Sequence, residues 1–165
     1  MNCIECGKGP VEVRRENHRY AECGLDTVTL QNLEVSHCRD CGETEWVTPD
    51  VEGLHALIAN VVASKPERLL PQEIRFLRKY LGHSTKDFSR IIGVRPETVS
   101  RWESADDPQQ MDLSTERFLR LMVFHERPAN HYPQARLEDT AVKHSAARNF
   151  RFTAGPTGWK SVTRA

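Results

Sequence analysis

The apolar and polar positions divide this chain into a strand-like head and a helical middle. Apolar and polar residues alternate over residues 11–13, 28–30 and 33–35, and this period of two predicts half-buried strands. From residue 50 to residue 126 the apolar positions recur at helical spacing instead. The pattern therefore predicts an α+β fold, with a small β-rich module over residues 1–48 and helices after it.

Residues 49–65 form the first predicted helix, which we interpret as a connector between two domains. Asp50 is its expected N-cap, and the helix should end before Pro66, because proline disfavours helical geometry in the residue that precedes it. Its apolar side chains recur on one face, at Val51, Leu54, Leu57, Ile58, Val61 and Val62.

Residues 66–127 predict an all-helical domain. The expected helices cover residues 71–81, 84–92, 96–104 and 114–126. Gly82 and Gly93 should end the first and second of them, since glycine adopts the left-handed geometry common after a helix. Ser84 is the expected N-cap of the second helix, with Asp87 reaching back toward it.

Residues 128–165 carry a weaker pattern, which prolines interrupt. One interpretation is a short helix over residues 137–147 and a β-hairpin over residues 150–162. The other is a mostly disordered basic tail, and the sequence leaves both open.

Composition adds limits to this picture. The chain has 165 residues, which suits one domain or two small ones. Its mean hydropathy is −0.59, and no apolar run approaches the roughly 20 residues that a membrane span needs. No basic-then-apolar signal segment opens the sequence, so we expect a cytoplasmic protein without a membrane partner.

The zero net charge hides an asymmetry between the two ends. Residues 1–50 carry five basic and ten acidic side chains, a net charge of −5. Residues 128–165 carry six basic and two acidic side chains, a net charge of +4. An acidic head and a basic tail predict different partners for different parts of the chain.

The cysteines predict a metal site in the head. Cys3 with Cys6, and Cys38 with Cys41, form two Cys-x-x-Cys-Gly knuckles that can place four sulfurs at the corners of a tetrahedron. We predict one structural Zn²⁺ per chain, and a rubredoxin-like Fe(Cys)₄ site is the chemical alternative. The fifth cysteine, Cys23, has no paired neighbour and is expected to be a core or turn residue.

The helical domain contains a pattern typical of DNA-reading proteins. Gly93 separates two short helices, as in a helix-turn-helix. On the second of these helices Val99 and Trp102 should pack inward. Arg101 should point outward, where its planar guanidinium group can donate two hydrogen bonds to a guanine. The predicted DNA-binding residues are Thr85, Lys86, Arg95, Pro96, Glu97, Ser100 and Arg101. The alternative is a structural helical bundle whose exposed faces bind nothing.

Two strings of residues carry a family resemblance. Val-Ser-Arg-Trp-Glu at residues 99–103, preceded by Thr-Lys-Asp-Phe-Ser-Arg-Ile-Ile-Gly-Val at residues 85–94, resembles Cro/repressor-type (XRE) helix-turn-helix domains. With the cysteine knuckles and the connector helix, residues 1–127 resemble the MqsA-type antitoxins with a YgiT-type zinc finger. The resemblance implies a homodimer, a structural zinc and a palindromic operator in double-stranded DNA, with Trp102 and Glu103 in structural roles.

One position departs from the family, because Glu97 falls where the antitoxin carries Asn. A carboxylate repels phosphate and prefers an amino group of cytosine or adenine, so the family's operator sequence does not carry over.

Three functions follow as hypotheses. The first is a cytoplasmic DNA-binding repressor with structural zinc, nucleoid-associated when bound. The second is an antitoxin whose acidic head neutralises a small ribonuclease toxin and which represses its own operon. The third is an electron-transfer protein with Fe(Cys)₄. We do not expect an enzyme, because the sequence holds no nucleophile–base–acid spacing and four thiolates leave a metal no open position.

Overall fold

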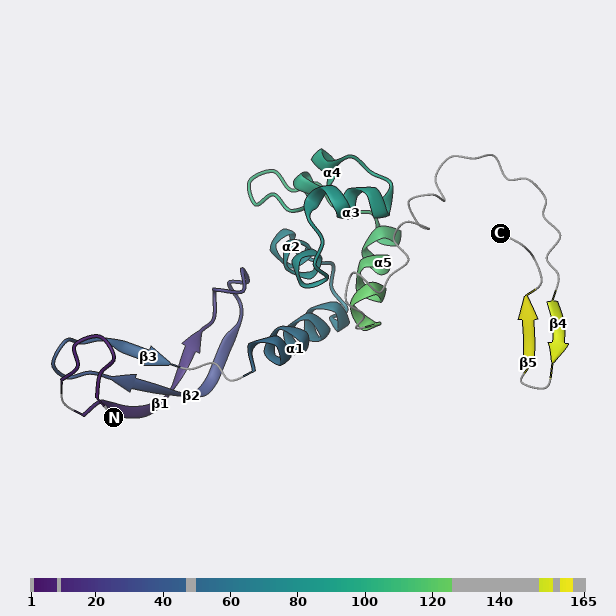
Figure 1. The fold of residues 1–165 in the computed structure, drawn as a ribbon. Coiled ribbons are helices and arrows are strands. Elements are labelled where there is room, and N and C mark those ends of the chain that lie inside the picture. Colours follow the sequence, from purple (N-terminus) through teal and green to yellow (C-terminus); the bar gives the residue numbers. More distant parts are fainter. Residues whose placement is uncertain (1, 9, 47–49, 126–151, 156–157, 162–165) are drawn as a thin grey trace.

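A computed structural model describes residues 2–8, 10–46, 50–125, 152–155 and 158–161 (Figure 1). The order of elements confirms the α+β class, with a three-stranded sheet before five helices. The strands are β1 (Glu12–Arg19), β2 (Thr29–His37) and β3 (Thr44–Trp46). The helices are α1 (Val51–Ser64), α2 (Pro71–Tyr80), α3 (Thr85–Ile92), α4 (Pro96–Trp102) and α5 (Leu113–Phe124). Two further strands follow, β4 (Phe152–Gly155) and β5 (Gly158–Ser161).

The first sheet is antiparallel, in the order β1-β2-β3. Residues 28–30 and 33–35, predicted as parts of two strands, lie in or beside the single strand β2. Asn32 explains this difference: its φ is 59°, and its backbone N–H bonds the Asn17 side chain where the β1–β2 register shifts. Asparagine tolerates this left-handed geometry, so the chain bulges here without turning back. The sequence pattern did not predict β3.

Helix α1 begins and ends where the sequence predicts. The Asp50 side chain accepts a hydrogen bond from the backbone N–H of Gly53 at 3.0 Å, as an N-cap does. A Cβ at Gly53 would lie 2.1 Å from an Asp50 carboxylate oxygen, so any other residue here would push the Asp50 side chain out of its capping position. Lys65 is extended at the other end, as the residue before Pro66 must be.

The remaining helices differ from their predicted bounds by one or two residues. Gly82 and Gly93 follow α2 and α3 with φ near 78° and 76°, the left-handed geometry expected after a helix. Ser84 caps α3 by accepting the Asp87 backbone N–H at 3.0 Å, and its hydroxyl donates to the Asp87 carboxylate. Helix α4 ends at Trp102, two residues before the predicted end.

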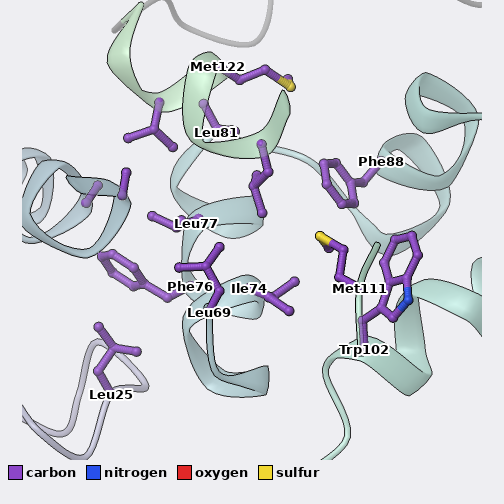
Figure 2. Close-up of a cluster of buried hydrophobic side chains, with 14 of the residues drawn as sticks. Leu25, Leu69, Ile74, Phe76, Leu77, Leu81, Phe88, Trp102, Met111 and Met122 are labelled. Atoms are coloured by element: carbon purple, nitrogen blue, oxygen red, sulfur yellow. The ribbon is translucent and has the colours of Figure 1, made fainter. Parts of the chain in front are cut away.

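One apolar cluster runs through the helical domain and into the head. Figure 2 shows Phe88, Trp102 and Met111 at one end of the cluster. At the other end Leu25, from the loop between β1 and β2, reaches toward α1 and α2. Leu25 is 1% exposed, so burying it ties the β-rich module to the helices.

The tail is described in part. Strands β4 and β5 pair antiparallel, which agrees with the predicted hairpin. The predicted helix over residues 137–147 lies outside the described residues. Within the described part of the chain, no helix has the length and apolar character needed to cross a membrane.

Candidate functional site

The two cysteine knuckles have the same local structure. The backbone N–H of Gly7 donates to the carbonyl of Cys3 at 3.0 Å, and that of Gly42 donates to the carbonyl of Cys38 at the same distance. Both glycines have positive φ, 68° and 75°, which an L side chain rarely adopts. Each Cys-x-x-Cys-Gly sequence therefore closes one tight turn that presents both of its sulfurs on one side.

The four knuckle sulfurs lie together at the tip of the module. All four lie within 4.8 Å of one another, and the Sγ atoms are 3.6 Å apart in both the Cys3–Cys41 and the Cys6–Cys38 pair. A tetrahedron with metal–sulfur bonds of about 2.3 Å has edges of about 3.8 Å, close to these separations. They are far longer than the roughly 2.05 Å of a disulfide bond. The four cysteines are thus arranged to hold one metal ion.

Thiol acidities in the cluster point the same way. The backbone N–H of Cys41 hydrogen-bonds the Cys38 sulfur and lowers the pKa of that thiol to about 7. The backbone N–H of Glu43 also favours the Cys41 thiolate, but the Cys38 sulfur, burial and the other thiols outweigh it and raise the Cys41 pKa to about 12. Crowded thiolates repel one another, and a bound cation removes that repulsion.

Two other residues of the head that could bind metal have other partners. The Cys23 thiol donates to the carbonyl of Tyr20 at 3.4 Å, in the loop after β1. The His37 ring nitrogens lie 3.0 Å from a Glu16 carboxylate oxygen and 3.5 Å from the Thr44 hydroxyl. The described cluster of ligand atoms contains neither residue.

Helices α3 and α4 are joined by a short turn at Gly93. The backbone N–H of Val94 donates to the carbonyl of Ser89 at 2.9 Å, which closes the end of α3. Pro96 then opens α4 at a position where a missing backbone N–H costs nothing. This is the helix, turn, helix order that the sequence predicts.

Helix α4 has one buried and one exposed face. Val99 is fully buried and Trp102 is 4% exposed, as predicted. Four predicted DNA-contacting residues share the exposed face: Pro96, Glu97, Ser100 and Arg101. The Ser100 hydroxyl donates to the carbonyl of Pro96, whereas the side chain of Arg101 makes no hydrogen bond or ion pair within the described residues. Arg101 is therefore available to a ligand.

The other three predicted contacts lie off this face. Thr85 and Lys86 form the first turn of α3, where Thr85 is half-buried and Lys86 is exposed. Arg95 is the exposed N-cap residue of α4. The structure thus brings four of the seven residues onto one helix and places three at the starts of the two helices.

A buried ion pair that sequence reasoning missed fixes the end of α4. Arg78 of α2 donates from Nε and Nη2 to the two carboxylate oxygens of Glu103, at 2.6 and 2.9 Å. Both side chains are less than one-tenth exposed, and Arg75 donates to the Glu103 carbonyl at 2.8 Å. One signal existed in the sequence: Arg78 lies four residues after the inward-facing Ile74, so it falls on the buried face of α2.

A second network ties α5 to the segment before α2. Glu116, buried at the start of α5, accepts hydrogen bonds from Arg68, Arg120 and the backbone N–H of Leu69. Arg120 also donates to the carbonyls of Ala63 and Lys65, at the end of α1. These bonds hold the connector helix against the helical domain.

The described residues thus combine a cluster of four cysteines that could hold a metal ion with a group of five helices. A family model described as the antitoxin component of a bacterial toxin-antitoxin system, MqsA, matches residues 1–128. The chain belongs to this antitoxin family, as the resemblance implied. No curated protein and no solved structure matches it.

Proposed function

We propose that this protein is a zinc-containing antitoxin that binds operator DNA as a homodimer and represses transcription. The exposed face of α4 is the observation that carries the proposal. Its buried face and the Arg78–Glu103 pair hold the helix rigidly, while Arg101 extends into solvent. A reading helix needs this combination of fixed backbone and unpaired outward side chains.

The DNA proposal is tested with one base-contact variant and one phosphate-contact variant. Sequencing the DNA that co-purifies with the native protein would first identify the operator. Arg101→Ala should then cost about 1–3 kcal/mol on the operator and much less on random DNA. Lys86→Ala should weaken both by similar factors, because a phosphate contact carries no sequence information. If Arg101→Ala lowered the affinity for operator and random DNA equally, Arg101 would contact a phosphate and not a base. If it lowered neither affinity, α4 would have a structural role only.

A homodimer would give the two recognition helices that a palindromic site needs, near 34 Å apart. Helix α5 supports this proposal, because Leu121 and Phe124, one turn apart, are each about half exposed. Sedimentation should give a dimer at micromolar concentration, and Leu121→Asp should give a monomer that binds the operator weakly. A wild-type monomer with and without DNA would contradict the proposal.

The metal proposal is a structural Zn²⁺, one per chain, held by Cys3, Cys6, Cys38 and Cys41. The separations between their sulfurs and the absence of other ligand atoms in the described cluster support a closed four-thiolate shell. Such a metal supplies folding free energy to a module too small for a large core. Metal analysis that found iron, with a coloured protein, would favour the electron-transfer alternative.

A toxin-neutralising role for the head is the second candidate function, and its charge distribution favours it. Each of its four arginines forms an ion pair with a carboxylate. Four acids near the knuckles, namely Glu5, Asp40, Glu43 and Glu45, form no ion pair within the described residues. The head therefore repels DNA and suits a basic partner such as a ribonuclease.

The toxin role is tested by charge reversal. Glu43→Lys with Glu45→Lys should weaken co-purification of a basic toxin encoded beside this gene, and should leave operator affinity unchanged. Glu34→Lys is the matched control, because Glu34 pairs with Arg15. If the reversal leaves toxin binding intact, this surface is not the toxin site. Such a protein would act in the cytoplasm, on the nucleoid when it is DNA-bound.

A further inference from the structure

Strand β2 has a free edge over its first part. Strand β3 pairs only with Val35, Ser36 and His37, at the end of β2 (Figure 1). The other neighbour, β1, lies on the opposite edge, and the bulge at Asn32 faces that side, where its N–H bonds the Asn17 side chain. Within the described residues, the part of β2 before Val35 therefore has no strand beside it on the β3 side. Such an edge is a template for another strand.

The hydrogen-bond pattern shows which backbone groups face this edge. The Tyr20 backbone N–H donates to the Val28 carbonyl at 2.9 Å, so Val28 faces β1. Successive residues of a strand face its two edges alternately, so the backbone groups of Thr29 and Gln31 face away from β1. Gln31 has no partner in the β1 register and makes no hydrogen bond within the described residues. Its N–H and C=O are thus available on the free edge.

An apolar groove of about 740 Å³ lies along this edge, between β2 and α1. Five consecutive residues, 27–31, belong to its lining. Because side chains of a strand point alternately to the two faces of a sheet, a lining of consecutive residues places the groove at the edge. From the other wall, α1 contributes Leu57 and Val61, which are each 63% exposed. A strand laid along this edge would meet backbone partners on one side and apolar side chains on the other.

We propose that an extended segment of a basic partner protein adds to the free edge of β2 as a further strand, with alternate apolar side chains in the groove. The proposal rests on the toxin-neutralising function proposed above and describes how the head would hold that toxin. In strand addition, main-chain hydrogen bonds give affinity, and pockets for alternate side chains give specificity. Five residues beside residues 29–33 would extend about 17 Å. The volume of the groove lies within the about 300–1,000 Å³ typical of ligand pockets.

Charge favours a basic partner over a second copy of this chain. Residues 1–50 carry a net charge of −5, so two heads placed edge to edge repel each other. Glu45 lies one residue from the end of β3, beside the place where an added strand would begin. It is exposed and forms no ion pair within the described residues. A lysine or arginine at the end of the added strand would find a partner there.

The test uses the toxin encoded beside this gene, produced together with the full chain and purified as the complex. Amide exchange at Gln31 should slow at least about tenfold when the toxin is bound, because its N–H gains an acceptor. Gln31→Pro removes this N–H and places a ring on the free edge. It should weaken toxin binding at least about tenfold.

Val13→Pro is the matched control on the outer edge of the sheet. The Cys38 backbone N–H donates to the Glu43 carbonyl at 2.8 Å, so Cys38 and, two residues before it, Ser36 face β3. Val13 is the β1 partner of Ser36, so its own N–H faces away from β2. Val13→Pro should therefore leave toxin binding unchanged. Unchanged metal content, and unchanged exchange in α2, would verify that both proline variants keep their fold.

A second variant tests the groove and leaves the strand edge intact. Val61→Gln puts a neutral polar side chain on the α1 wall, and it should weaken toxin binding about tenfold because the added strand loses apolar contact. Val51→Gln is the matched control, since Val51 is an exposed valine of α1 that does not line the groove. It should bind the toxin as the wild type does.

The outcomes separate this inference from the function on which it rests. If the toxin binds the wild type and Gln31→Pro equally well, or leaves exchange at Gln31 unchanged, strand addition is wrong and the toxin-neutralising function stands. If no toxin binds the wild type, both are wrong. Protection of Gln31 that depends on the concentration of the free chain would assign the edge to a second copy and would also overturn the proposal.

Discussion

The Glu103→Gln substitution tests how the structure holds α4. It keeps the shape of the side chain and removes the charge that faces Arg78, whose side chain is 7% exposed. Removing one partner of a buried ion pair costs about 3–5 kcal/mol, because the other charge stays buried without compensation. The glutamine oxygen can still accept one of the two hydrogen bonds, so we expect about 3 kcal/mol.

Thermal unfolding, followed by far-UV circular dichroism, measures this cost. In a domain of 60–100 residues, 1 kcal/mol shifts Tm by about 4–8 °C, so Glu103→Gln should lower Tm by about 12–24 °C. Glu97→Gln is the matched control, because Glu97 lies in the first turn of α4, is exposed and forms no ion pair within the described residues. It should change stability by less than about 0.5 kcal/mol.

A double variant tests whether the cost comes from leaving Arg78 buried without its partner. Arg78→Met with Glu103→Leu removes both charges and should restore most of the lost stability. It should fall short by about 1 kcal/mol, because Arg78 Nη1 also donates to the His83 carbonyl at 2.7 Å. If Glu103→Gln shifts Tm no more than Glu97→Gln does, the buried Arg78–Glu103 pair is not what holds α4 in place.

Two further predictions concern the metal and acid stability. Cys6→Ser should remove the bound metal and unfold the head while the far-UV helical signal persists, as metal analysis with circular dichroism would show. Burial raises the pKa of Glu116, but Arg68 and Arg120 outweigh it and hold that pKa below its usual range. The stabilisation is therefore present above the ordinary carboxyl pKa of about 4.3 and lost as pH falls through the folded value. Acid titration should destabilise the wild type more steeply than Glu116→Gln.

Local signals in the sequence predicted the helices well. Asp50 and Ser84 as N-caps, and Gly82 and Gly93 as stops, act through bonds to residues a few positions away, so a single sequence reveals them. The strands were harder to predict. Asn32 interrupts the alternation in β2 without ending the strand, so the pattern there suggested two strands instead of one.

Long-range contacts were not predictable from periodicity. Leu25 lies in a loop with no repeating pattern, yet it is among the most buried residues of the described chain. The Arg78–Glu103 pair joins residues 25 positions apart, and only the folded chain identifies the partners. The metal ligands were predictable because each knuckle is local and tetrahedral coordination then requires the two knuckles to meet.

The loop between β1 and β2, which carries Leu25, links the stability of the four-cysteine module to that of the helices. Tyr20 directly follows β1, is 7% exposed, and its hydroxyl lies 3.0 Å from His55 Nε2 of α1. The His55 ring in turn meets the buried Phe76 of α2 edge-on. Loss of the metal would loosen the sheet that positions Tyr20 and Leu25, and so would expose apolar surface on α1. A partner that clamps the head would reach α1 and α2 through these same contacts, because they lie directly between the two parts.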